Sequence, residues 1–185
     1  MEISISNYDE AFRESKRVLL AGGVLVYPTD TVYGIGGDAS RPETIKRVET
    51  IKRRKEGKPF SILLGSVSIV RSYCKTEEQF SYCMRYLPGP FTFIVGDHNS
   101  KVGIRVPVHS FMMRLSQELG IGIITTSANT SGNKAPCTLQ EVEERIKKEA
   151  DLAIDGGRTM YCMPSAVVDL VEKKVIREGP EPFEF

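Results

Sequence analysis

The chain has 185 residues, of which 41% are hydrophobic and 26% charged, and its formal net charge at pH 7 is +1. This length suits one buried core, and this composition excludes disordered, collagen-like and membrane proteins. No apolar run approaches the roughly 20 residues that span a bilayer, and the amino terminus lacks a signal-peptide pattern. We therefore expect a single domain over residues 1–185, located in the cytoplasm, with no membrane partner.

The first predicted elements are a helix and a buried strand. Apolar residues at helical spacing in 8–21, followed by Gly22, predict a helix with a glycine stop. The apolar run 24–27 predicts a strand, and polar residues follow it at 29–31. Polar side chains at the end of a strand are typical of a ligand-binding loop. The glycine cluster 34–37, taken by itself, predicts a tight turn with positive φ.

A basic segment follows the next predicted helix, which begins at Pro42 and has Val48 and Ile51 on its apolar face. Between Lys46 and Lys58 there are seven basic and two acidic residues, an excess of five positive charges. This charge alone allows three interpretations. It fits a solvated helix end, a nucleic-acid patch or one wall of a phosphate site.

Strands and helices alternate through the rest of the chain. Strands are predicted at 60–64, 91–95, 102–106, 121–124, 152–154, 166–171 and 175–177, the last two as a hairpin, and helices within 67–86, over 110–119 and from 138. Together these elements predict an α/β fold, in which helices flank a twisted sheet of mixed parallel and antiparallel strands.

Cysteine and histidine usage argues against several kinds of site. The four cysteines are widely spaced and form no CxxC pair, so we expect neither a disulfide framework nor a protein-held metal ion. Only His98 and His109 could serve a catalytic triad, and we predict both to be ordinary surface or loop residues.

Polar segments that follow predicted strands are suited to binding anions. They are 29–31, Arg105, 127–131 and 155–165, and their hydroxyl, amide and guanidinium groups match phosphate and carboxylate oxygens. No Walker P-loop or Rossmann fingerprint is present. Taken singly, each segment also fits a structural role, as a cap, a turn or an ion pair.

Six motifs, in the same order, resemble those of the YrdC-like family. They are 27–34 (YPTDTVYG), 52–54 with 58–59 (KRR and KP), 87–92 (LPGPFT), 105–107 (RVP), 127–132 (SANTSG) and 164–169 (PSAVVD). The resemblance spans nearly the whole chain and implies a YrdC-like fold with a concave basic cleft. It also implies a nucleotidyltransferase, a threonylcarbamoyl-AMP synthase that combines L-threonine, bicarbonate and ATP and releases pyrophosphate. The product would serve the threonylcarbamoyl modification of adenosine 37 in tRNA.

The resemblance also assigns residues to roles, and these assignments are expectations. The catalytic pair would be Lys52 and Arg54. The nucleotide would be bound by Arg54, Lys58, Lys101, Asn129, Cys137, Thr138 and Arg177, and threonine by Thr31, Arg105, Ser127 and Ser165. Arg105 would pair with the threonine carboxylate. Mg²⁺ is expected to accompany ATP, although no sequence pattern marks a carboxylate as its ligand.

Departures from the family pattern leave alternatives open. Lys55, Leu63 and Ala166 stand where many members have proline, histidine and threonine. The alternatives are a paralogue with a different substrate and a non-catalytic RNA-binding module that binds tRNA or double-stranded RNA through the basic residues. The hydroxyl and amide loops favour the enzyme, because a protein that tracks a nucleic-acid backbone needs no small polar pocket. The expected protein partner is the machinery that transfers threonylcarbamoyl to tRNA.

Overall fold

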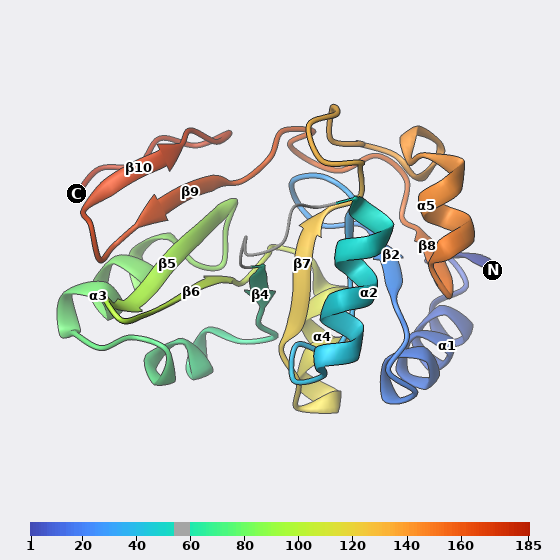
Figure 1. Ribbon diagram of the computed structural model, residues 1–185, viewed down its shortest axis with the longest axis horizontal. Coiled ribbons are helices and arrows are strands. Elements are labelled where there is room, and N and C mark those ends of the chain that lie inside the picture. Colours follow the sequence, from blue (N-terminus) through green and yellow to red (C-terminus); the bar gives the residue numbers. More distant parts are fainter. Residues whose placement is uncertain (54–59) are drawn as a thin grey trace.

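The computed structural model describes residues 1–53 and 60–185, and Figure 1 shows the arrangement of their helices and strands. The helices are α1 (Tyr8–Leu20), α2 (Pro42–Lys52), α3 (Glu77–Tyr86), α4 (Ser110–Leu119) and α5 (Glu144–Glu149), with 3-10 helices η1 (Val67–Ser72) and η2 (Leu139–Glu141). The strands are β1 (Glu2–Ser4), β2 (Leu25–Tyr27), β3 (Gly34–Gly36), β4 (Ser61–Leu63), β5 (Phe91–Asp97), β6 (Ser100–Arg105), β7 (Ile123–Ser127), β8 (Leu152–Asp155), β9 (Ala166–Asp169) and β10 (Lys174–Arg177).

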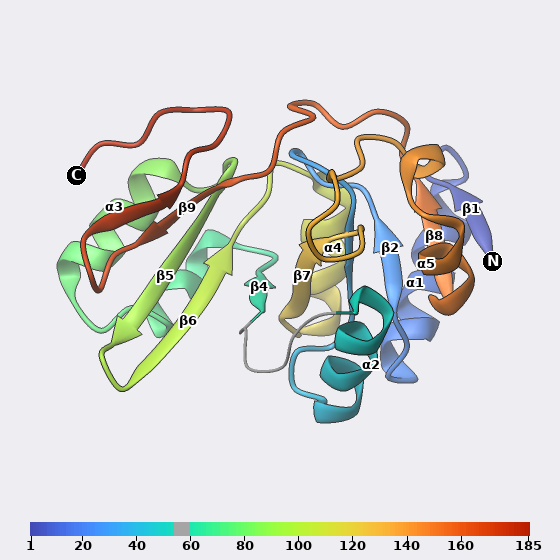
Figure 2. The same ribbon diagram turned by 45° about the horizontal axis from the view of Figure 1, so that its top comes forward.

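The strands of the described residues form one mixed sheet in the order β1-β8-β2-β3-β7-β4-β6-β5-β9-β10. Parallel pairs join β8 to β1 and β2, β4 to β6, and β5 to β9. The other neighbours pair antiparallel, including the expected hairpin of β9 and β10. The predicted α/β fold with a mixed sheet is confirmed. In Figure 2, β5, β6 and β9 lie on one side of β7, and β2 and β8 on the other.

One expectation was wrong: the segment from Gly34 to Gly36 is strand β3 and not a tight turn, and its glycines do not have positive φ. It pairs antiparallel with both β2 and β7. A Cβ at Gly36 would lie 1.6 Å from the carbonyl oxygen of Ile124, so no larger residue fits between these strands. The glycines here serve close backbone approach, which the sequence pattern does not distinguish from a turn.

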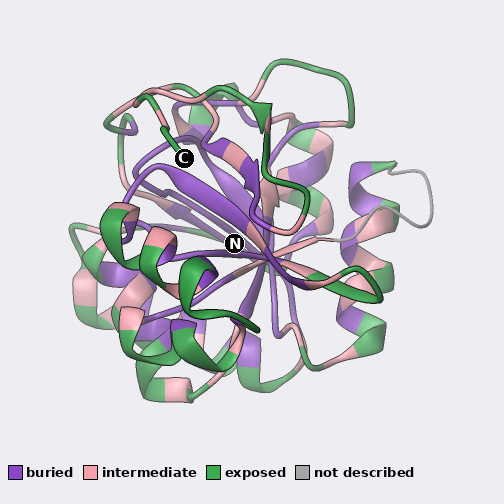
Figure 3. Cartoon of the chain, turned by 90° about the vertical axis from the view of Figure 1, so that its left-hand side faces the viewer, coloured by how far each residue is buried: buried purple, intermediate pink, exposed green. Residues whose placement is uncertain are grey.

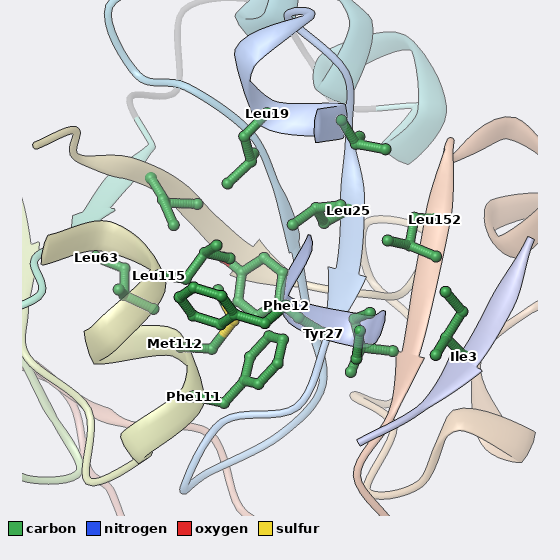
Figure 4. Packing of buried hydrophobic residues seen from close by; sticks show 14 residues of the cluster. Ile3, Phe12, Leu19, Leu25, Tyr27, Leu63, Phe111, Met112, Leu115 and Leu152 are labelled. Carbon is green, nitrogen blue, oxygen red and sulfur yellow. The ribbon is translucent and has the colours of Figure 1, made fainter. Parts of the chain in front are cut away.

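Helices cover both faces of the half of the sheet that holds β2 and β8. Leu25 and Leu152 pack with α1 and α4 in one cluster, in which Phe12 and Phe111 meet edge to face at 5.6 Å (Figure 4). Burial of each such phenylalanine contributes roughly 1.5–3 kcal/mol. Val26 points to the opposite face and packs with α2, η2 and α5. Figure 3 shows the buried strands inside and the exposed helix residues outside.

The other half of the sheet has a polar face. Phe91 and Phe93 of β5 pack with α3 and η1 on one side. Because side chains alternate along a strand, Thr92 lies on the opposite side, where it lines a cavity. None of the described helices combines the length and the apolar composition needed to cross a membrane.

Candidate functional site

A cavity of about 610 Å³ lies where the polar segments meet. The loop after β2, the end of α2 and strands β4, β5, β6, β7 and β10 all contribute to its wall. The predicted site residues that line it are Thr31, Lys52, Arg105, Ser127, Asn129, Ser165 and Arg177. Segments that are far apart in the sequence, from Thr31 to Arg177, therefore form one site. The ligand that each residue binds stays a prediction.

Other predicted residues are not among those that line the cavity. Lys101 pairs with Asp169 at 3.1 Å and Glu172 at 2.6 Å, and these contacts, with Glu172 first, raise its pKa. The hydroxyl of Thr138 caps η2 by accepting a hydrogen bond from the backbone N–H of Glu141. Both side chains have partners within the protein, and the contacts of both with a nucleotide remain predictions.

Two of the predicted phosphate-binding residues, Arg54 and Lys58, lie outside the described residues, as does Lys55. Cys137 is buried behind the rim of the cavity and not in its wall. It forms a disulfide with Cys162, with a Cα–Cα distance of 5.0 Å. We expected no disulfide, and that expectation was wrong.

The disulfide joins two loops that the fold brings together. The backbone N–H of Thr159 donates to the carbonyl oxygen of Cys137 at 2.9 Å, so the loop before β9 lies against the loop before η2. The two cysteines are 25 residues apart in the sequence, a spacing that gives no signal of pairing. Gly132 and Pro164, which line the cavity, belong to the same two loops. The cross-link therefore stabilises part of the cavity rim.

Reduction of this disulfide is expected to lower the free energy of unfolding by about 3.5 kcal/mol, because it frees a loop of 25 residues in the unfolded chain. Urea unfolding with and without dithiothreitol measures the change. Cys162→Ser is the matched control and should not respond to dithiothreitol. Thiol titration of the unreduced, unfolded chain should detect only Cys74 and Cys83. Four reactive thiols, or equal stability with and without reductant, would contradict the cross-link.

The guanidinium of Arg105 is fixed at the floor of the cavity and is 6% exposed. Its Nη2 donates to Oδ1 of Asp30 at 2.6 Å, and its Nη1 donates to Oγ1 of Thr31 at 3.2 Å. Its Nε is buried without a hydrogen-bond partner within the described part of the chain. A buried donor without a partner is costly, so this guanidinium is not fully satisfied by the described protein groups, and it lines a cavity in which a carboxylate would be a matching partner.

Arg177 and a pair of hydroxyls form the wall beside Arg105. Nε and Nη2 of Arg177 donate to the carbonyl oxygen of Ser165 at 2.9 and 2.7 Å. The hydroxyl of Ser165 lies 2.9 Å from that of Thr92. Arg177 is exposed as a whole residue, but partial burial of its guanidinium first, and then the nearby charge of Arg105, lower its pKa. Two cations near each other disfavour their own charged forms, so an anion between them would be stabilised.

Lys52 ends α2 and is almost fully buried, with 2% of its surface exposed. Its ammonium donates to the backbone carbonyl oxygens of Ser127 and, at 2.8 Å, of Asn129. The N–H of Ser131 donates back to the carbonyl of Lys52 at 3.1 Å. Lys52 therefore holds the loop after β7 in place. Its expected catalytic role remains a prediction.

The loop after β7 is also held from its outer side, by Glu143. The carboxylate accepts hydrogen bonds from the backbone N–H of Thr130 at 2.9 Å, from its hydroxyl at 2.7 Å and from Asn133 at 3.1 Å. These hydrogen bonds, led by the Thr130 hydroxyl, lower the pKa of Glu143 to about 2. Asn129 donates from Nδ2 to two carbonyls, and its buried Oδ1 has no partner within the described residues. That oxygen can accept a hydrogen bond from a ligand.

Several residues that shape the cavity were not predicted from the sequence. Asp30, Thr92 and Glu143 each position a predicted site residue or its loop. Asp30 and Thr92 belong to motifs that the analysis quoted, which was a usable signal. Glu143 had no such signal, since its contacts depend on how the loop after β7 folds against α5.

Comparisons with known proteins give consistent results. The segment 17–179 matches the family model Sua5/YciO/YrdC, whose description is telomere recombination. A Methanocaldococcus jannaschii protein, provisionally named as a threonylcarbamoyl-AMP synthase, is 32% identical over 180 residues, which is 91% of this chain and 86% of that protein. The threonylcarbamoyl-AMP synthase of Mus musculus is 33% identical over 181 residues, 89% of this chain.

Among solved structures, that of P. abyssi Sua5 complexed with L-threonine resembles this chain with a TM-score of 0.85 and 26% sequence identity over 97% of this chain. This chain spans 57% of that protein and 64% of the mouse relative.

Proposed function

The chain belongs to the Sua5/YciO/YrdC family, and on that premise we propose that it is a threonylcarbamoyl-AMP synthase. In this proposal it joins L-threonine, bicarbonate and ATP and releases pyrophosphate, and its relatives are named for the product, threonylcarbamoyl-AMP. The observation that carries this proposal is the cavity lined by the guanidinium groups of Arg105 and Arg177 and by several hydroxyls, in which Arg105 is buried and its hydrogen-bonding capacity is not fully used by the described residues. A small, polar, carboxylate-bearing substrate such as threonine fits such a site.

The proposed reaction needs no nucleophile from the protein. The amine of threonine reacts with bicarbonate to give a carbamate and water, and a carbamate oxygen then attacks the α-phosphorus of ATP. The bond from that phosphorus to the bridging oxygen breaks, and pyrophosphate leaves with the electron pair. The protein must hold two anionic reactants in line and stabilise the charge that develops on the phosphates. The cavity offers positioning groups of this kind.

Roles follow from the positions of the residues. Arg105 binds the threonine carboxylate through its guanidinium, and Thr31 keeps that guanidinium oriented by accepting from Nη1. Ser165, in the wall beside Arg105, binds the polar end of threonine. Asn129, whose Oδ1 can accept a hydrogen bond, contacts the nucleotide, and Lys52 keeps the Asn129 loop in place.

Magnesium belongs to the proposal as part of the ATP substrate. Within the described residues, no group of three or more acidic, histidine or cysteine side chains could hold a metal ion. The carboxylate of Asp30 near the cavity is already paired with Arg105. The described residues therefore do not fit a protein-held Mg²⁺, and the ion would be carried by the ATP phosphates.

The decisive assay is pyrophosphate release from ATP. We expect release only when L-threonine and bicarbonate are both present, because the carbamate is the attacking group. Mass spectrometry should detect threonylcarbamoyl-AMP in the same reactions, and omission of threonine is the control. ATP breakdown at the same rate without threonine would contradict the synthase. We further propose that the product passes to tRNA-modifying machinery in the cytoplasm.

A further inference from the structure

Asp30 is a buried carboxylate directly behind the cavity. The residue is 2% exposed, and its side chain in the ion pair with Arg105 is fully buried. Arg105 and Thr31 line the cavity, but Asp30 does not. A buried carboxylate is costly unless it is paired and hydrogen-bonded. A charged carboxylate at this place therefore requires hydrogen-bond and ion-pair partners, and the structure provides them.

The contacts of Asp30 join three segments of the chain. Oδ1 accepts from Nη2 of Arg105 at 2.6 Å, and Oδ2 accepts from the backbone N–H of Val108 at 3.1 Å. The backbone carbonyl of Asp30 accepts from the N–H of Tyr161 at 3.0 Å. The carboxylate is therefore fixed between the end of β6 and the segment before α4. Because Asp30 cannot move, it fixes the plane of the Arg105 guanidinium.

Asp30 also sets the charge of the cavity wall. Arg105 and Arg177 are near enough for the charge of Arg105 to lower the pKa of Arg177. With Asp30 included, these three side chains carry one net positive charge, which matches one carboxylate. Without Asp30, they would carry two positive charges in a partly desolvated site. A single guanidinium donor, Nε of Arg105, then remains buried and without a partner within the described residues.

We propose that Asp30 is a positioning residue for threonine recognition, which orients the guanidinium of Arg105 in the cavity wall toward the substrate carboxylate. This inference rests on the proposed function. Asp30 touches no substrate and acts only through Arg105. Its loss should therefore weaken threonine binding selectively, because the nucleotide side of the cavity has separate supports in Lys52 and Glu143.

The test compares Asp30→Asn with the wild-type chain. We expect the KM for threonine to rise about 30-fold, because the substitution removes a charge-assisted hydrogen bond that orients Arg105. The KM for ATP should change less than about twofold. Titration calorimetry with threonine alone gives a second readout that does not depend on turnover. If Asp30→Asn does not fold, Asp30→Ser replaces it, since serine fits the space and introduces no charge.

The matched control is Asp38→Asn, which removes another buried carboxylate that pairs with an arginine, Arg41, away from the cavity. It should lower stability without changing the KM for threonine. Wild-type threonine affinity in Asp30→Asn, or equal losses for threonine and ATP, would overturn the proposal. A wild-type chain that neither binds threonine nor releases pyrophosphate would instead refute the proposed function.

Discussion

Arg105→Ala is expected to lower kcat/KM for threonine by about 1,000-fold, the largest effect on turnover that we anticipate at a single position. The substitution removes a desolvated donor from the proposed carboxylate site, and truncation of one partner in such a charged pair costs about 2–5 kcal/mol. The same substitution leaves the fully buried carboxylate of Asp30 without its ion pair. We therefore expect the free energy of unfolding to fall as well.

A double variant separates these two effects. Asp30→Asn combined with Arg105→Ala removes the unpaired buried charge, so stability should recover relative to Arg105→Ala alone. Turnover with threonine should not recover, because the guanidinium is still absent. Steady-state pyrophosphate release and urea unfolding measure the two quantities. Arg41→Ala, which breaks a partly exposed ion pair away from the cavity, is the control for arginine loss. A folded Arg105→Ala chain with near-normal turnover would remove Arg105 from the site.

Local patterns in the sequence determined much of the fold. The helix beginning at Tyr8 and the hairpin of β9 and β10 were predicted because apolar spacing and glycine or turn residues carry local information. Strand β3 was missed because its glycines are required by β7, a strand almost ninety residues further along the chain. Pairing between distant segments leaves no local trace, and so the turn seemed the better interpretation.

The candidate site shows the same division. Thr31, Arg105, Ser127 and Ser165 were predicted from ordered motifs, and all four line one cavity. The sequence did not indicate which hydrogen bonds and ion pairs fix these side chains in position. Asp30 meets Arg105 across 75 positions of the chain. The motifs thus indicated which residues would meet, while their supports depend on tertiary packing.

The structure changed the interpretation of Lys52 more than that of any other predicted site residue. The basic segment allowed a solvated helix end, a nucleic-acid patch or a phosphate wall. Lys52 is in fact buried, and Arg53 ends the helix after it with a φ of 48°. The lysine lines the cavity and at the same time binds two backbone carbonyls of the loop after β7. The structure therefore excludes a solvated position for Lys52 and shows that its ammonium supports the loop, while its contact with an anionic ligand stays a prediction.

Lys52→Met is accordingly expected to lower the free energy of unfolding by about 4 kcal/mol, the largest effect on stability that we anticipate. Methionine fills similar space but removes two hydrogen bonds to a charged donor, each of which contributes about 1.5–3 kcal/mol. The buried carbonyl of Asn129 loses its donor, whereas the carbonyl of Ser127 still accepts from the backbone N–H of Asn129 at 2.9 Å. The loop carries residues for both proposed substrates. Turnover should therefore fall by about 100-fold, with higher KM values for threonine and for ATP.

Urea unfolding and the pyrophosphate assay again provide the measurements, and Lys46→Met is the matched control because Lys46 is an exposed lysine on the same helix. It should leave stability within about 0.5 kcal/mol of the wild-type value. A Lys52→Met chain as stable as this control would show that the two carbonyls do not need the ammonium. A rise in the KM for ATP alone would point to phosphate binding rather than support of the loop, because the carbonyl of Ser127 belongs to the threonine side.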